Sequence, residues 1–178
     1  MIAAFVESLA ASQIGTTCNF YREGVGAPVR RQRLAAYLEA CQGAPWILVG
    51  EAAGYRGARV SGIPFTSERQ LTGRLPGEAT ATIVHRVLSD LGVAEQVLLW
   101  NLVPTHPHAP GRALTNRAPT RAEIAAARPF LAELTRGRRV IPVGRLAHAE
   151  LGGAYVRHPS HGGALAFQAG LLEYGLGK

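Results

Sequence analysis

Apolar and polar positions along the chain switch repeatedly between strand and helix periodicity. Short apolar runs predict buried strands at residues 45–50, 96–100, 138–144 and 154–156. Amphipathic stretches predict helices at residues 3–11, 28–41, 77–92, 120–137 and 145–151, and from about residue 163 onward. This alternation predicts an α/β fold, a three-layer α/β/α sandwich with a central four-stranded parallel sheet. We expect residues 1–178 to form a single domain, because the length suits one core and no linker interrupts the pattern.

Polar side chains gather in the segments that follow the predicted strands. Ligands of parallel α/β sheets bind outside the carboxyl ends of the strands. Two of the segments there, 50–70 and 101–119, run to about twenty residues, a length that is usually functional in a compact domain. Three strand ends therefore bring polar side chains to one edge of the sheet, namely Glu51, Asn101 and His158.

The charged residues narrow the possible chemistry. The net charge is +7, and eighteen arginines stand against one lysine, Lys178, and one aspartate, Asp90. Such an excess attracts polyanions such as nucleic acid, although arginine-rich usage also fits a GC-rich coding sequence. A Schiff-base mechanism is disfavoured because the only lysine ends the chain.

The cysteines and the apolar content indicate the compartment. Cys18 and Cys41 form no C-x-x-C pair, so we expect a reducing, intracellular, cytoplasmic setting. The N-terminal stretch lacks the basic region of a signal peptide, and no apolar run is long enough to span a membrane.

Several local motifs can be weighed against their chemistry. The turn "GEAAGYRG" lacks the spacing of a dinucleotide-binding loop, and no P-loop is present. Ser160 lacks a nucleophile elbow, and no aspartate is at hand to orient a histidine. Glu51 could pair with an arginine, Phe65 could anchor the core, and Asn101 could cap a strand end. A four-histidine metal site is also conceivable but short of carboxylates, from His106, His108, His158 and His161.

Three segments taken in order carry a stronger signal. "GEAAGYRG…GIPFTSE", "NLVPTHP…NRAPTRAEIAAARPFL" and "HPSHGG" resemble the uracil-DNA glycosylase superfamily, from about Trp46 to Gly163. They are most similar to its iron–sulfur, thermostable-type class, often numbered family four. The resemblance implies a DNA glycosylase of base-excision repair that flips a deaminated base, uracil first of all, and hydrolyses its N-glycosidic bond. Without an amine nucleophile, we expect a monofunctional enzyme that leaves an abasic site.

The resemblance also implies roles for single residues. Glu51 matches the polar residue of the motif beside the deoxyribose and the attacking water. Phe65 matches the aromatic ring on which the flipped base stacks, and Asn101 matches the amide that reads the base edge; Ala52 lies with them around the base. His158 matches the histidine that stabilises negative charge on the departing base.

Other positions are expected to touch the DNA. The resemblance and the glycine content point to four residues near the DNA backbone, namely Gly54, Ser160, Gly162 and Gly163. A wedge that fills the gap left by the flipped base is expected from His161, Leu165 or Phe167. The expected partner is DNA containing uracil or another deaminated base, bound by a monomer.

Departures from the family pattern shape the remaining expectations. Thr105 and Ala127 stand at two of the four positions where this class carries the cysteines that bind the cluster, and the N-terminal region offers only Cys18. We therefore expect no iron–sulfur cluster, and no other cofactor or metal.

Two alternatives remain for the function within this resemblance, and one outside it. Ala52 stands where some relatives carry a water-activating Asp or Asn, Ala53 replaces the usual proline, and Gly54 replaces a tyrosine that blocks thymine. The chain could thus act on hypoxanthine or xanthine, or be a DNA-binding relative without catalysis. An α/β nucleotide-binding protein unrelated to DNA is the third alternative.

Overall fold

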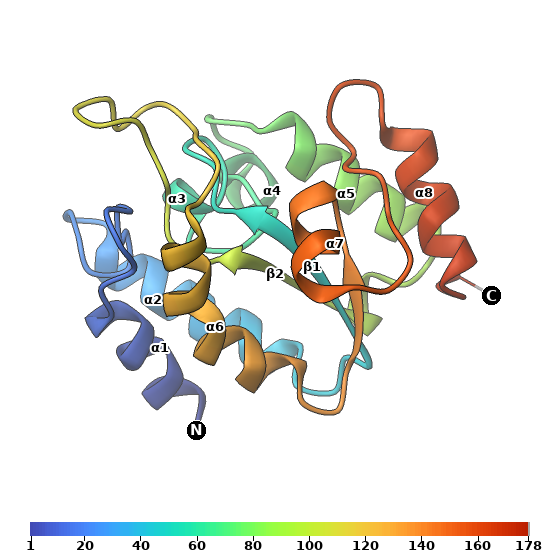
Figure 1. Cartoon of the computed structure of the whole chain (residues 1–178), viewed down its shortest axis with the longest axis horizontal. Helices are drawn as coiled ribbons and strands as arrows, with labels where there is room; N and C mark the ends of the chain where they lie inside the picture. Colours follow the sequence, from blue (N-terminus) through green and yellow to red (C-terminus); the bar gives the residue numbers. More distant parts are fainter. Residues whose placement is uncertain (178) are drawn as a thin grey trace.

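Three parallel strands form the centre of the molecule. The computed structural model describes residues 1–177, so Lys178 lies outside the described residues. The strands are β1 (Trp46–Ala52), β2 (Val97–Val103) and β3 (Arg139–Pro142), in the spatial order β2-β1-β3 (Figure 1). The central strand β1 pairs Gly50 with Asn101 of β2 and Val49 with Pro142 of β3, so all three strands end at one edge.

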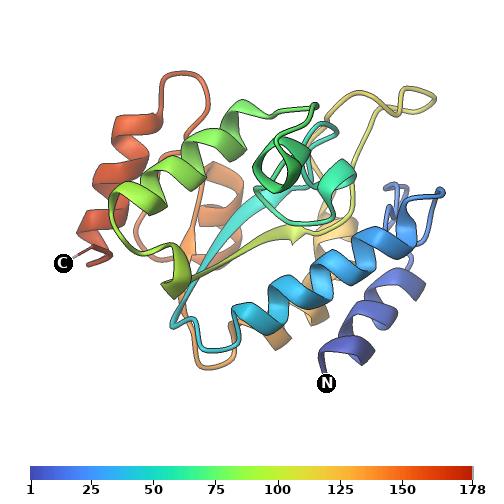
Figure 2. The same cartoon turned by 180° about the vertical axis from the view of Figure 1, so that it is seen from behind.

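Helices cover both faces of this sheet. They are α1 (Ile2–Ala11), α2 (Ala27–Ala40), α3 (Ala58–Ser61), α4 (Glu68–Thr72), α5 (Ala79–Asp90), the 3-10 turn η1 (Ala94–Gln96), α6 (Arg121–Thr135), α7 (Arg145–Leu151) and α8 (Ala164–Glu173). Helices α1, α2 and α6 lie on one side of the strands, and α5 and α8 on the other (Figures 1 and 2). None of the helices within residues 1–177 is long and apolar enough to cross a membrane.

The strands are apolar throughout because each face is buried. Ile47 and Trp100 pack into the cluster that α1, α2 and α6 cover, whereas Leu48 and Leu99 pack into the cluster that α5 and α8 cover. Alternate residues of one strand point to opposite faces, so a continuous apolar run is what a doubly covered strand requires. The predicted three-layer α/β/α arrangement is thereby confirmed.

The predicted fourth strand at 154–156 is wrong. Val156 pairs with Val143 through a single parallel bridge, in which the Gly144 N–H donates to the Val156 carbonyl at 2.8 Å. Gly153 before it has φ +82°, and Pro159 after it has no N–H to donate. The extended stretch between those two residues is therefore too short for a ladder.

The long connections after β1 and β2 are partly ordered by short elements. Helices α3 and α4 lie within the first connection, which sequence periodicity did not reveal because each spans little more than one turn. In the second connection, His106 pairs with Cys18 as an antiparallel bridge and thereby joins the N-terminal segment. Both connections rise over the carboxyl edge of the sheet (Figure 2).

Candidate active site

A cavity of about 480 Å³ opens at the carboxyl ends of the strands. It brings together eight of the residues singled out from sequence, namely Glu51, Ala52, Gly54, Phe65, Asn101, His158, Ser160 and His161. Its lining also includes residues that sequence reasoning missed, among them Glu78, Thr80, Asn116, Arg117 and Gly144. Gly162, Gly163 and Leu165 are not part of the lining and lie in the following turn and in α8. The cavity therefore lies at the sheet edge where the sequence predicted that the polar residues meet.

Phe65 and Asn101 meet beside Gly50. Both residues are buried, at 8% and 4% exposure, yet both line the cavity. A Cβ atom on Gly50 would lie 2.8 Å from Phe65 Cε2 and 3.0 Å from Asn101 Oδ1, so the absence of a side chain lets the ring and the amide approach. Phe65 takes φ +52°, a strained value for an aromatic residue. It also packs into the core cluster under α5, so it serves as an anchor as well as a cavity wall.

Within residues 1–177, no side-chain hydrogen bond engages the Asn101 amide. The amide can both donate and accept. Burying such a group without a partner costs free energy. Asn101 is therefore not a strand-end cap, and its hydrogen-bonding groups are available to a molecule in the cavity.

His158 is held by Ser160. The Ser160 backbone N–H donates to His158 Nδ1 at 3.2 Å, and the Ser160 hydroxyl lies 2.8 Å from the same nitrogen. Because a backbone N–H can only donate, Nδ1 is the acceptor, and the neutral ring carries its proton on Nε2. Burial lowers the pKa of His158, with the charges of Arg157 and His161 adding to the effect. The ring is thus a neutral Nε2–H donor at the cavity wall.

Ser160 also contacts His161, the residue that sequence reasoning left unassigned. His161 Nδ1 lies 3.0 Å from the Ser160 hydroxyl, which therefore sits between the two imidazole rings. In the free protein the hydroxyl orients His158. Contact of Ser160 with the DNA backbone stays a prediction.

The turn after Ser160 leads into α8. Gly162 has φ +74° and open space around it, and a Cβ atom on Gly163 would collide with the His158 carbonyl oxygen. No side chain caps α8 at Gly163, so the N–H groups of its first turn remain available, and the helix dipole favours an anion there. A phosphate could be bound at this terminus.

The wedge candidates differ in exposure. Leu165 is 82% exposed, and His161 is exposed with φ +52°. Phe167 is fully buried in the cluster beneath α8, so its prediction as a wedge is wrong: it faces the core from the opposite side of the helix. Two candidates, His161 and Leu165, therefore remain.

Glu51 and Glu78 are the two carboxylates of the cavity. Burial raises the pKa of Glu51. No arginine forms an ion pair with Glu51 among the described residues, so the alternative that it pairs with an arginine is not supported. Burial also raises the pKa of Glu78, which precedes α5 at its N-cap position. The sequence placed Glu78 in the first turn of the helix predicted at residues 77–92, so it gave no hint of a place in the cavity.

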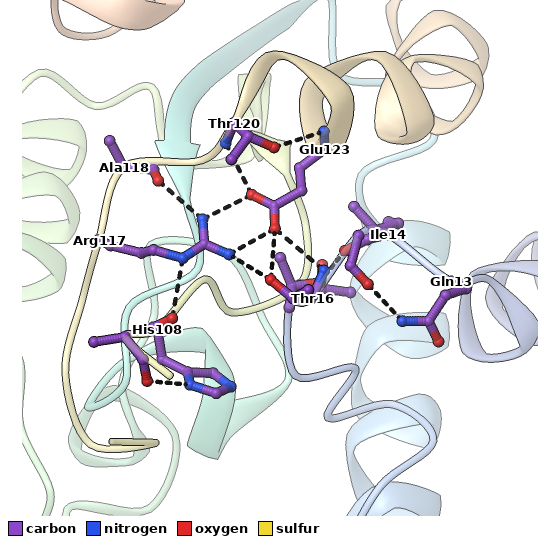
Figure 3. A network of polar contacts seen from close by, with 12 residues as sticks. Gln13, Ile14, Thr16, His108, Arg117, Ala118, Thr120 and Glu123 are labelled. Atoms are coloured by element: carbon purple, nitrogen blue, oxygen red, sulfur yellow. Dashed lines mark hydrogen bonds and ion pairs between the residues drawn. The ribbon is translucent and has the colours of Figure 1, made fainter. Parts of the chain in front are cut away.

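Arg117 ties the second connection to its surroundings (Figure 3). Its guanidinium forms a bidentate pair with Glu123 at 2.6 and 2.8 Å, and also donates to Thr16 Oγ1. The remaining donors reach the carbonyl oxygens of His108 and Ala118. All five N–H groups are thereby used, so Arg117 has none left for a phosphate. This guanidinium holds the pKa of the buried Glu123 at about 2.

Two contacts join the long connections across the cavity mouth. His106 Nδ1 lies 2.8 Å from the Ala53 carbonyl oxygen, and its Nε2 lies 3.2 Å from the Ala113 carbonyl oxygen. The Asn116 side-chain oxygen accepts the Tyr55 N–H at 3.1 Å. These bonds fix the walls of the cavity before any ligand enters.

The residues at the cluster positions do not fit an iron–sulfur group. Thr105 Oγ1 lies 2.6 Å from Thr17 Oγ1, Ala127 is fully buried, and Cys18 is the only thiol there, whereas the group needs thiolates. The four-histidine alternative also lacks support. Within residues 1–177, no three His, Cys, Asp or Glu side chains gather as metal ligands.

Comparison with known proteins places this geometry in a family. The family model of the uracil DNA glycosylase superfamily matches residues 39–172, about three quarters of the chain. No curated protein matches the chain. Among solved structures, wild-type SMUG2 from Pedobacter heparinus is similar in fold, with a TM-score of 0.64 and 16% identity over 97% of this chain and 94% of that one. The chain, with its cavity at the strand ends, belongs to the uracil DNA glycosylase superfamily.

Proposed function

We propose that this protein is a monofunctional uracil-DNA glycosylase, which flips uracil out of DNA and hydrolyses its N-glycosidic bond. One observation carries the proposal: the unpaired Asn101 amide, the Phe65 ring and the neutral His158 donor line one cavity. A flipped base needs an aromatic face and a matching hydrogen-bonding edge, and these side chains supply both.

Recognition would rest on Asn101 and Phe65. The amide oxygen can accept the N3–H of uracil while the amide nitrogen donates to O4. The base would stack against Phe65, whose strained backbone and contact with Gly50 hold the ring in place.

Bond cleavage needs help at both ends of the N-glycosidic bond. As the bond between C1′ and N1 breaks, its electron pair leaves with the base, and His158 donates a hydrogen bond to the charged O2. Positive charge develops on the deoxyribose at the same time, and the Glu51 carboxylate would stabilise it. Water then adds to C1′ and leaves an abasic site.

DNA would be held around the cavity by backbone contacts. The uncapped N-terminus of α8 suits a phosphate, and Gly162, with no side chain and open space around it, allows close approach. The net charge of +7 supports attraction to DNA and predicts that binding weakens as salt rises. No lysine lies within residues 1–177 to form an imine with the sugar, which favours a monofunctional reaction.

A second substrate class is favoured by the small residues of the cavity. Ala52 and Ala53 line it without bulk, and Gly54 carries no side chain to block a larger base; the group that lies against Gly54 is the Glu78 carboxylate. The Asn101 amide can rotate to suit hypoxanthine or xanthine. A panel of oligonucleotides with uracil, hypoxanthine, xanthine or thymine separates these substrates.

The test measures base release by wild type, Asn101→Asp and His158→Ala, on single- and double-stranded DNA at enzyme excess. We expect wild type to release uracil, and Asn101→Asp to gain activity on cytosine, because a carboxylate accepts from the N4 amine. Gln42→Glu, the same amide-to-acid change at an exposed position outside the cavity lining, is the control. Release of no base by wild type would contradict the proposal. DNA binding without turnover would instead support the inactive relative.

A further inference from the structure

We infer that Glu78 is a catalytic residue of this site, the carboxylate that takes the proton of the attacking water. The inference rests on the proposed function and deepens it. The family resemblance left this role open, because Ala52 stands where some relatives carry a water-activating side chain, and Glu51 was the alternative base for the water. Glu78 reaches the cavity from a different segment, just before α5.

Glu78 stands directly before α5, but its side chain does not cap this helix. It is the N-cap residue of α5, with extended backbone angles, but its side chain accepts no hydrogen bond from the first turn of the helix. The shorter side chains of Ser, Thr, Asp or Asn normally accept hydrogen bonds from those N–H groups, and the Glu78 side chain does not. The side chain instead turns toward the connection after β1 and lines the cavity.

Two glycines make room for it. A Cβ atom on Gly57 would lie 2.9 Å from Glu78 Cδ, closer than such atoms approach, and a Cβ atom on Gly54 would collide with Glu78 Oε1. The carboxylate therefore rests directly on the backbone of the turn that follows the Glu51 strand end. In the family that the sequence resembles, the motif at this strand end lies beside the deoxyribose and the attacking water.

The third observation is the absence of a partner. Buried or partly buried carboxylates outside the cavity are paired: Glu68 with Arg33 at 2.8 Å, and Glu123 with Arg117. In the described part of the chain, neither an ion pair nor a side-chain hydrogen bond engages the Glu78 carboxylate, although arginine is abundant. An unpaired, partly buried carboxylate lowers stability, so a functional role is the simplest reason to retain it. Its raised pKa also makes it a stronger base than a solvent-exposed glutamate.

The bond between C1′ and N1 breaks, and its electron pair leaves with the base. The water oxygen forms a bond to C1′ and loses a proton to the Glu78 carboxylate. That proton passes to solvent or to the base anion, which yields a neutral base and an abasic site.

The experiment compares wild type, Glu78→Gln and Glu51→Gln in single-turnover release of uracil across pH 5 to 9. Glu95→Gln is the control, because Glu95 is exposed on η1 and away from the cavity. We expect Glu78→Gln to be about 100-fold slower and to lose the acid limb of the pH profile. Affinity for DNA with an abasic-site analogue should stay within about twofold, because base catalysis stabilises the transition state only.

Chemical rescue separates catalysis from structure. Glu78→Ala should regain at least tenfold activity with sodium formate, and none with sodium chloride at equal ionic strength. The inference is overturned if Glu78→Gln keeps the wild-type rate. It is also overturned if Glu78→Gln and Glu78→Ala both lose activity and formate does not restore the activity of Glu78→Ala. Wild type that releases no base from the whole panel would overturn the proposed function and this inference together.

Discussion

The backbone N–H of Ser160 donates to Nδ1 of His158, and this one bond fixes which nitrogen of the ring can act on a leaving base. With Nδ1 occupied, only Nε2 can present a proton toward the cavity. Burial lowers the pKa of His158, so the ring is neutral at pH values near and above the ordinary histidine pKa. The site is therefore built for hydrogen-bond donation to an anion rather than for an ion pair.

The first prediction concerns this donor. His158→Ala should slow single-turnover uracil release by about 100-fold to 1,000-fold, the usual effect of losing one donor to a developing anion. Because the ring acts in its neutral form, His158 should contribute no loss of wild-type rate as pH rises from 6.5 to 9. His148→Ala, in α7 and outside the cavity lining, is the control. A rate that falls over this range in wild type but not in His158→Ala would show that the charged ring is the active form.

The second prediction concerns Gly50. Gly50→Ala should displace the Phe65 ring and crowd the Asn101 amide, and misplacement of this kind costs about 100-fold in rate. Uracil release and melting temperature should be measured together. Gly43→Ala is the matched control, because a Cβ atom there would meet open space. Wild-type uracil release by Gly50→Ala would show that the contact of Gly50 with Phe65 is not needed.

The third prediction concerns Arg117 and Glu123. Arg117→Ala leaves the buried Glu123 carboxylate without its partner and should lower the free energy of unfolding by about 3–5 kcal/mol. Urea unfolding measures this, with Arg112→Ala as an exposed control in the same connection.

The same pair predicts an acid transition. The pKa of Glu123 is about 2 in the folded protein and near 4.5 in the unfolded chain, so the pair stabilises the fold above pH 4.5. This contribution is lost as pH falls toward 2. Arg117→Ala should flatten that part of the stability profile, and an unchanged profile would contradict the assignment.

The fourth prediction concerns the wedge. Leu165→Ala should reduce uracil release from double-stranded DNA by about tenfold and leave single-stranded DNA unaffected, because only a duplex has a stack to fill. Leu165 is 82% exposed beside the site, and Val25→Ala, at a fully exposed position in the N-terminal segment, is the control. Equal losses on both substrates would assign Leu165 to general DNA binding, and no loss would leave His161 as the wedge.

The sequence by itself determined the layers and the edge of the sheet that carries the cavity. Buried parallel strands need apolar residues on both faces, so β1 and β2 could be located from local composition alone. Glu51 and Asn101 lie at the carboxyl ends of β1 and β2, and His158 follows the bridge at Val156. Parallel strands end at the same edge of the sheet, so these residues line one cavity. Family motifs in the same order pointed to the superfamily that the family model matches.

Only the tertiary structure decided the rest, because those features depend on contacts between distant segments. The segment at 154–156 has strand-like residues, but glycine turns and Pro159 leave it one bridge. By sequence, Glu78 belongs to the first turn of the helix predicted at residues 77–92. Only the fold shows that Gly54 and Gly57, more than twenty positions earlier, accommodate its carboxylate. Side-chain direction in a loop is set by such neighbours rather than by any local period, and no pattern along the chain encodes it.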